Sequence, residues 1–277
     1  MNKQALIFAG LLLMSSGIAA QTLEQVVNQR PPEMQQRDAH RHPIQTLEFF
    51  RVEPGMTVAE ALPGGGWYTQ IIAPTLGKNG MIYGINYNDD MWARFGFFSP
   101  DAIIQQQALT KQFEQNVADL GDTMPPARGF TFETVPESLK GTADRVLFIR
   151  ALHNLHRFEA DAGTLTQALK VAHILLKPNG LAGVVQHRAP EKSSDAWADG
   201  SAGYLKTSRV IEAFKQAGFA LIDASEVNAN AKDTPNEQDI VWRLPPSYFG
   251  SDSDDKKAAM QAIGESDRMT LLFAKTP

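Results

Sequence analysis

The feature that most constrains the fold of this chain is a glycine-rich turn between a short apolar run and a helical pattern. The apolar run covers residues 57–62, the turn reads Pro63-Gly64-Gly65-Gly66, and the helical pattern continues to about Leu76. Glycine lets backbone amides approach a ligand closely, and the N-terminus of a following helix directs unpaired N–H groups towards it. This order of elements holds nucleotide-type ligands in doubly wound sheets. The turn alone is equally typical of an ordinary structural turn.

Strand and helix patterns alternate along the rest of the chain. Residues 81–85 read as a second strand, so that strand, helix and strand form the βαβ unit of a parallel sheet. Residues 145–149 form an uninterrupted apolar run, which is typical of a central strand buried on both faces. Further strands are predicted at 130–134, 181–186, 219–224 and 269–274, and a long helix at about 100–120. The pattern predicts an α/β fold.

Composition excludes several classes of function. The 277 residues are enough for one α/β domain with a sizeable core. A formal net charge of −5 gives no basic surface, so we expect no nucleic acid partner. The chain contains no cysteine, which excludes disulfides, thiolate catalysis and Cys-ligated metals.

The first twenty residues have the order of a secretory signal peptide. A positive charge at Lys3 precedes an apolar run over residues 5–14, and residues 15–20 are small and neutral. The run is too short to span a bilayer, and we expect cleavage after Ala19 or Ala20. The mature chain is then expected to be periplasmic or secreted, without a stable membrane anchor. The open alternative is an uncleaved N-terminal anchor.

With these elements in order, the sequence from about Glu53 onward resembles the class I, S-adenosylmethionine-dependent methyltransferases. The resemblance rests on Glu60-Ala-Leu-Pro-Gly-Gly-Gly-Trp67, on Asp-Arg-Val-Leu-Phe-Ile at 144–149 and on Leu-Lys-Pro-Asn-Gly at 176–180. More narrowly, residues 63–68, 152–154 and 203–204 are similar to segments of predicted exported bacterial methyltransferases. The resemblance implies a Rossmann-like, doubly wound, mostly parallel seven-stranded sheet with helices on both faces. It divides the chain into a signal peptide (1–20), a helical extension (21–52) and a methyltransferase-like domain (53–277).

The resemblance also implies a set of residues that bind S-adenosylmethionine. They are Glu60 at the amino end of the cofactor, Pro63, Gly64, Gly65 and Gly66 in the loop, Tyr68 in the first helical turn, and Asn86 at the ribose. Two positions depart from the family pattern. Leu62 stands at the first glycine of the loop, and Asn86 replaces an acidic residue, so the charge-assisted pair with the ribose hydroxyls is lost. The alternatives are a helix-terminal carboxylate for Glu60 and packing for Tyr68.

Two histidines are the candidate catalytic residues. His153 follows the strand at 145–149 and His187 follows the strand at 181–186. Because the carboxyl ends of adjacent parallel strands meet at one edge, the two imidazoles are expected to converge where ligands bind. A neutral imidazole there serves as a general base for an acceptor oxygen or nitrogen. Structural or metal-binding roles are the alternatives, but no three-ligand motif is present, so we predict no metal site.

The sequence therefore predicts a methyltransferase that uses S-adenosylmethionine and a small-molecule acceptor. It specifies neither the chemical identity of the acceptor nor the oligomeric state. The alternative is an exported small-ligand-binding protein that keeps the fold without methyl transfer, motivated by Leu62, Asn86 and the export signal. A third hypothesis is a metal-dependent hydrolase built on the histidines. The long polar stretch at 228–246 is either a lid over the substrate or a solvated surface loop.

Overall fold

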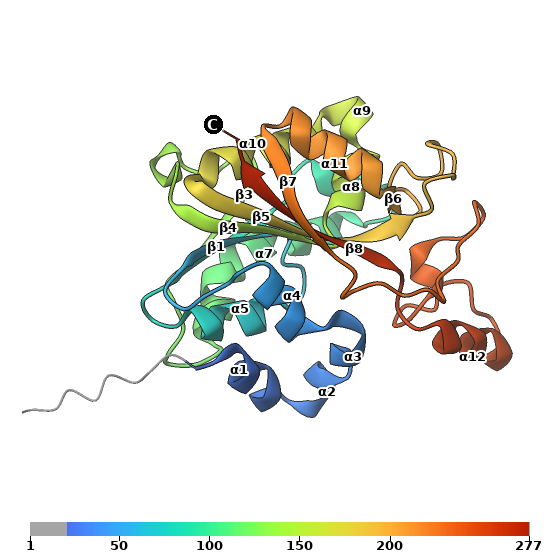
Figure 1. The fold of residues 1–277 in the computed structure, drawn as a ribbon, viewed down its shortest axis with the longest axis horizontal. Coiled ribbons are helices and arrows are strands. Elements are labelled where there is room, and N and C mark those ends of the chain that lie inside the picture. The colour runs from blue at the N-terminus through green and yellow to red at the C-terminus, as the bar shows by residue number, and fades with distance from the viewer. Residues whose placement is uncertain (1–20, 277) are drawn as a thin grey trace, which may run out of the picture.

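The computed structural model describes residues 21–276, so the predicted signal peptide lies outside the described residues. A central sheet separates two layers of helices (Figure 1). The helices are α1 (Leu23–Gln29), α2 (Pro32–Gln35), α3 (Asp38–Arg41), α4 (Pro43–Phe49), α5 (Thr69–Leu76), α6 (Met91–Arg94), α7 (Pro100–Ala118), α8 (Leu152–Arg157), α9 (Glu159–Ala162), α10 (Thr164–Leu175), α11 (Thr207–Gln216) and α12 (Asp254–Ile263). The strands are β1 (Thr57–Ala61), β2 (Met81–Asn86), β3 (Ala127–Thr131), β4 (Ala143–Ile149), β5 (Leu176–Ala189), β6 (Leu205–Lys206), β7 (Phe219–Ser225) and β8 (Arg268–Lys275). No helix within residues 21–276 is long and apolar enough to cross a membrane.

Local sequence signals explain where several helices begin. Thr22 and Gln25 form a reciprocal capping box at the start of α1, with hydrogen bonds of 3.2 and 2.9 Å. Ser99 accepts a hydrogen bond from the backbone of Ala102 at the start of α7, and Pro100 occupies the first turn. These caps satisfy backbone N–H groups that the helix itself leaves without partners.

The strands follow the order β3-β2-β1-β4-β5-β8-β7, with the short β6 beside β5. Strands β1 to β5 are parallel, and β8 runs antiparallel to both β5 and β7. This confirms the predicted doubly wound, mostly parallel sheet with helices on both faces. The chain proceeds outward from β1 to β3 and then returns to place β4 on the other side of β1. The carboxyl ends of β1 and β4 therefore form the switch point at which such sheets bind ligands.

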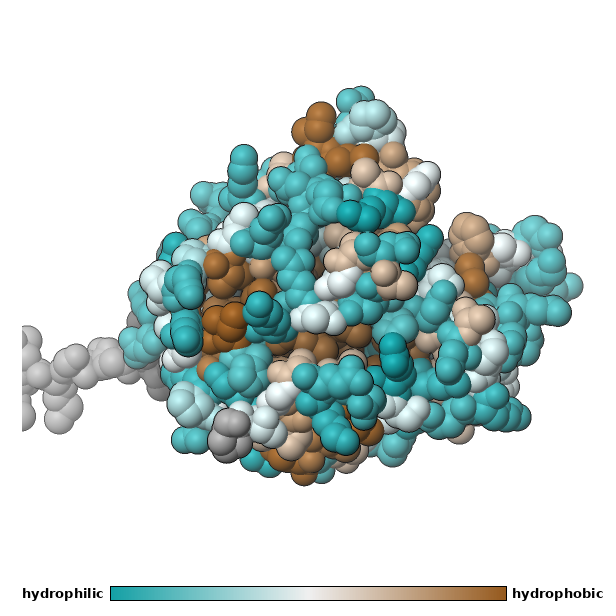
Figure 2. Space-filling view, turned by 90° about the horizontal axis from the view of Figure 1, so that it is seen from above, coloured by the Kyte–Doolittle hydropathy of each residue, from teal (hydrophilic) through white to brown (hydrophobic). Residues whose placement is uncertain are grey.

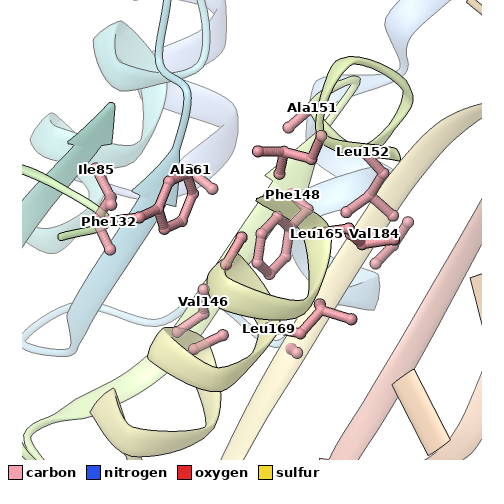
Figure 3. Close-up of a cluster of buried hydrophobic side chains, with 14 of the residues drawn as sticks. Ala61, Ile85, Phe132, Val146, Phe148, Ala151, Leu152, Leu165, Leu169 and Val184 are labelled. Atoms are coloured by element: carbon pink, nitrogen blue, oxygen red, sulfur yellow. The ribbon is translucent and has the colours of Figure 1, made fainter. Parts of the chain in front are cut away.

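One hydrophobic core lies between the sheet and the helices α10 and α11. Figure 3 shows Val146 and Phe148 of β4 lying against Leu165 and Leu169 of α10. Phe214 of α11 is fully buried in the same cluster. The surface of this side, viewed from above in Figure 2, is mainly polar with scattered apolar patches. The helices of this layer therefore turn their apolar sides towards the sheet.

A second core lies on the opposite face and includes the N-terminal helices. Val26 of α1 and Leu47 of α4 belong to the same buried cluster as Ile71 and Ile72 of α5 and Phe113 of α7. Residues 21–52 thus contribute apolar side chains to the core beneath β1 and β4. The domain boundary at residue 53 stays a prediction.

The third strand lies earlier in the chain than residues 130–134. It spans Ala127–Thr131 and pairs in register with β2, while the backbone of Thr134 turns back to bond with Thr131. Gly84 of β2 and Gly129 of β3 lie so close to α7 that a Cβ at either position would clash with it. Close packing of α7 on these glycines sets the position of β3, and the local apolar pattern does not contain this information.

Candidate active site

The loop between β1 and α5 has a conformation that glycine favours. Gly64 and Gly66 have φ angles of 56° and 74°. Leu62 has the same left-handed conformation, with a φ of 55°, although this costs a residue with a Cβ about 1–2 kcal/mol. At the position where the family pattern has glycine, the leucine therefore adopts a backbone geometry that glycine would adopt without strain.

Two adjoining cavities lie at this loop. The first has a volume of about 300 Å³ and lies between the loop and α7, where it is lined by Pro63, Gly64, Gly65, Gly66 and Asn86. The second has a volume of about 250 Å³ and lies over the carboxyl ends of β1, β2, β4 and β5. Its lining includes Leu62, Gly64, Asn86, Arg150, His153, His187 and Trp242. Because Gly64 and Asn86 line both cavities, the predicted cofactor loop and the two predicted catalytic histidines share one site.

Glu60 and Tyr68 lie beneath the loop and are not part of the lining of either cavity. Glu60 Oε2 accepts a hydrogen bond of 2.6 Å from the hydroxyl of Thr69, in the first turn of α5. Burial raises the pKa of the Glu60 carboxyl to about 7, although the hydrogen bond from Thr69 lowers it. The hydroxyl of Tyr68 donates to the backbone oxygen of Arg41 at 3.3 Å. The contact of Glu60 agrees with the alternative of a helix-terminal carboxylate, and that of Tyr68 agrees with the alternative of packing. Binding of the cofactor by Glu60 and Tyr68 stays a prediction.

Asn86 ends β2 with one half of its amide already engaged. Its Oδ1 accepts a hydrogen bond of 2.9 Å from the backbone N–H of Tyr87. The Nδ2 group is therefore the part of the amide that is available as a donor to a ligand in the cavities. Asp89 and Asp90 are both exposed, and Asp90 forms an ion pair with Arg94. Neither carboxylate lines the two cavities in the place of the acidic residue that Asn86 replaces.

The side chain of Gln186 fixes the tautomer of His153. Gln186 Nε2 donates to the backbone oxygen of Gly203 at 2.9 Å, so its Oε1 is the atom that faces His153. This oxygen accepts hydrogen bonds from the backbone N–H of His153 at 3.3 Å and from its Nδ1 at 3.4 Å. Nδ1 therefore carries the proton, and Nε2 has the free lone pair that a general base requires.

His187 lies next to His153, with 5.5 Å between the ring centroids. Its Nδ1 lies 2.6 Å from the hydroxyl of Ser266. Burial lowers the pKa of His153 to about 4, with a further lowering by the charge of Arg150. Burial, the neighbouring His153 and three arginines hold the pKa of His187 well below its usual range. Both imidazoles are therefore neutral at pH 7.

Three arginines next to this site, of which two are buried and Arg150 is half-buried, are absent from the residues predicted from the sequence. Arg150 follows β4 and lines the second cavity, Arg268 begins β8, and Arg41 ends α3. The sequence signal for Arg150 is its place directly after an uninterrupted apolar strand, where parallel sheets present their ligand-binding residues. Arg41 and Arg268 join it only through tertiary structure.

The polar excursion after β7 contributes a wall to the second cavity through Trp242. The indole lies 5.9 Å, centroid to centroid, from the ring of His153. The neighbouring Arg243 forms an ion pair of 2.8 Å with Asp233, whose side chain is fully buried. The polar stretch at 228–246 is thus anchored by a buried ion pair, which distinguishes it from a solvated surface loop. Movement of this segment as a lid stays a prediction.

The other histidines lie outside this site. His156 contacts the backbone of Asp199 and the guanidinium of Arg209, and His173 lies against Phe219. Within residues 21–276, no three histidine, aspartate or glutamate side chains are arranged to hold a metal ion. A larger cavity of about 550 Å³ lies between α10 and α11, away from the carboxyl ends of the strands.

Comparison with solved structures identifies the fold. No family model matches the sequence, and no curated protein matches it. The [4+2]-cyclase SpnF superposes with a TM-score of 0.53 at 14% identity, covering 87% of this chain and 82% of that one. Geranyl diphosphate C-methyltransferase from Streptomyces coelicolor superposes with a TM-score of 0.52 at 10% identity, covering 91% and 83%. At these identities the likeness concerns the fold alone, and this chain has the class I S-adenosylmethionine-dependent methyltransferase fold.

Proposed function

We propose that this protein transfers the methyl group of S-adenosylmethionine to a small-molecule acceptor. The observation that carries this proposal is the pair of adjoining cavities, where the glycine loop and Asn86 share one site with His153 and His187. The site lies at the switch point of the sheet, and its volume is in the range of small-molecule sites. Structures with this fold include a methyltransferase in complex with geranyl diphosphate and S-adenosyl-L-homocysteine.

The residues of the site fit this cofactor in two respects. A Cβ added at Gly65 would have no neighbouring atom within 4 Å, so the loop leaves open space in front of its backbone. Asn86 lines both cavities, and its Nδ2 group can donate a hydrogen bond to a ribose hydroxyl because only Oδ1 is engaged by the protein. We therefore propose that the loop and Asn86 bind the cofactor.

Catalysis in this proposal consists of positioning and proton removal. Bound S-adenosylmethionine supplies an electrophilic methyl group on a positively charged sulfur. His153 lines the cavity with an unprotonated Nε2, fixed in that form by Gln186. His153 would accept the proton of an acceptor O–H or N–H group at Nε2 and so make that acceptor atom nucleophilic for methyl transfer.

Calorimetric titration of residues 21–277 with S-adenosylmethionine tests the proposal. We expect saturable binding that Gly65→Asp abolishes, because the substitution adds a carboxylate at a lining residue of the first cavity, where its Cβ meets no protein atom. Asn79→Asp is the matched control, since it adds the same charge in an exposed turn between α5 and β2. Absence of binding to the wild type contradicts the proposal. Binding that produces no S-adenosylhomocysteine with any acceptor supports the alternative of a binding protein.

We also propose that the protein is exported and that its N-terminal signal peptide is removed. The order of charge, apolar run and small residues in this segment supports cleavage after Ala19 or Ala20. N-terminal sequencing of the protein recovered from the periplasm or the medium tests this. A start at Ala20 or Gln21 is expected, and recovery only from the cytoplasm with Met1 in place contradicts it.

A further inference from the structure

Three guanidinium groups contact a single carboxylate, and a fourth arginine, Arg150, belongs to the lining of the second cavity nearby. Glu265 contacts Arg37 at 2.6 Å, Arg268 at 3.1 Å and Arg41 at 3.8 Å. Arg150 adds a fourth positive charge and, within residues 21–276, takes part in no side-chain hydrogen bond or ion pair. Among the described residues, the ion pairs of these four arginines therefore involve one carboxylate, that of Glu265.

The neighbouring carboxylate Asp267 does not offset this excess. It forms two hydrogen bonds, of 2.8 and 2.9 Å, with Arg188 and accepts a third from the backbone of Asn230. Its hydrogen-bonding capacity is thus directed to other partners. A buried charge without compensation is costly, so a cluster of this kind requires an anion or solvent to stabilise it.

Several guanidinium nitrogens in the cluster are buried without a hydrogen-bond partner. They are Nε and Nη1 of Arg41 and the Nε atoms of Arg150 and Arg268. Arg41 and Arg268 are only 2% and 3% exposed. Guanidinium groups present donors in a fixed fork that matches the oxygen atoms of carboxylates and phosphates. The free donors and the excess of positive charge therefore both favour a ligand that carries a carboxylate or phosphate group.

The cluster adjoins the site where the acceptor is expected. Arg150 lines the second cavity together with His187. Arg268 lies directly opposite His187 in the β5–β8 register, so the two side chains share one face of the sheet. The guanidinium of Arg41 lies 4.3 Å from the centre of the Trp67 ring and 3.8 Å from the carboxylate of Glu265. The positive charges of all three arginines lower the pKa of His187, which agrees with their placement around it.

We propose that Arg41, Arg150 and Arg268 form an oxyanion subsite that binds the carboxylate or phosphate group of an acidic methyl acceptor. The proposal rests on the proposed function for the identity of the acceptor, whereas anion binding itself does not depend on it. S-adenosylmethionine carries one carboxylate, one ammonium and one sulfonium, so it brings no net negative charge to the cluster. An acidic acceptor does.

The test measures stabilisation by anions in the absence of the methyl donor. The melting temperature of residues 21–277 is recorded with benzoate, with inorganic phosphate and with the uncharged benzamide, at constant ionic strength set with sodium chloride. We expect the wild type to be stabilised by benzoate or phosphate and not by benzamide. The anion that acts identifies carboxylate or phosphate as the preferred group.

Arg150→Gln is the informative variant because its guanidinium has no protein partner to lose. We expect its melting temperature without ligand to equal or exceed that of the wild type, and its dissociation constant for the anion to rise about tenfold or more. Arg128→Gln, which removes an exposed arginine of β3, is the charge-matched control and should retain the anion effect. A purely structural Arg150 would instead lower the melting temperature without ligand.

A second arm separates the two sources of a carboxylate. When the anion titration is repeated in saturating S-adenosylmethionine, an acceptor subsite still responds to benzoate. Loss of that response, together with weaker binding of S-adenosylmethionine to Arg150→Gln, assigns the cluster to the cofactor carboxylate and overturns the proposal. Absence of any anion effect in the wild type also overturns it. Anion binding without S-adenosylmethionine binding leaves the subsite in place and contradicts only the proposed function.

Discussion

Oε1 of Gln186 accepts hydrogen bonds from both the backbone N–H and Nδ1 of His153, which links the strand β5 to the proton chemistry of α8. The same Gln186 is held by the backbone oxygen of Gly203 and is completely buried. A neutral amide in this place directs the imidazole without adding charge. Its replacement should therefore change the basicity of His153 in a direction set by the new side chain.

We predict that Gln186→Glu raises the pKa of His153 above about 4, whereas Gln186→Met lowers it further. A carboxylate favours the imidazolium, and loss of the amide oxygen removes the hydrogen bond that raises the pKa now. Titration of the histidine ring signals by NMR measures both variants. A shift in the same direction in both would show that repacking, and not the hydrogen bond, controls this group.

Glu60 and His153 should oppose each other in the pH dependence of stability. Because folding raises the pKa of Glu60 from 4.5 to about 7, its protonated carboxyl stabilises the folded state below pH 4.5. This stabilisation is lost as the pH rises to about 7. Because folding lowers the pKa of His153 from 6.5 to about 4, its neutral imidazole stabilises the folded state above pH 6.5. This stabilisation is lost as the pH falls to about 4. Between these limits the two slopes have opposite signs.

We therefore predict that, from pH 5 to pH 7, the free energy of unfolding of Glu60→Gln rises relative to that of the wild type. The difference in this change is up to about 3 kcal/mol. Gln keeps an oxygen that accepts from Thr69 and cannot ionise. For His153→Gln, the free energy of unfolding should fall from pH 5 to pH 7 relative to that of the wild type. Urea unfolding at the two pH values measures the slopes, and an unchanged slope in Glu60→Gln would exclude a neutral carboxyl in the folded state.

Leu62 offers a measurement of backbone strain within the loop. Leu62→Ala removes the side chain but keeps the unfavourable left-handed conformation, whereas Leu62→Gly removes both. We predict that the glycine variant is more stable than the alanine variant by about 1 kcal/mol. Denaturant unfolding of the pair isolates the strain, because the packing loss is common to both. Equal stability, or a less stable glycine variant, would show that the loop relaxes.

Loss of the buried ion pair between Arg243 and Asp233 should lower the free energy of unfolding far more than loss of a similar pair at the surface. Arg243→Met leaves the fully buried carboxylate of Asp233 without its charged partner, and we predict a loss of about 3–5 kcal/mol. Arg94→Met breaks the pair with Asp90, whose side chain is 61% exposed, and should cost less than about 1 kcal/mol. Denaturant unfolding of both variants tests the contrast, which similar losses would contradict.

The sequence contained enough information for the sheet and much of the loop, because these depend on local signals. The capping residues Thr22 and Ser99 and the apolar run of β4 are readable without tertiary structure. The start of α10 was not, since Gly163 adopts a left-handed conformation that separates α9 from α10.

The candidate site was only partly predictable for the same reason. His153 and His187 follow strands, so the rule that ligands bind at the carboxyl ends of parallel strands locates them. Arg41, Arg150 and Arg268 lie in three distant segments, and neither spacing nor periodicity relates them. The left-handed conformation of Leu62 is likewise a property of the folded loop, since leucine itself disfavours it.

The antiparallel strand β8 has a consequence for the order of folding events. Within the described residues, β7 pairs with the sheet only through β8, although β7 comes before it in the chain by more than forty residues. β7 therefore cannot join the sheet until β8 has inserted beside β5. Because loop closure over such distances slows folding, the sheet should assemble from β1 to β5 first. The guanidinium of Arg268 would then arrive with the final strand, so the binding site would form in the last folding step.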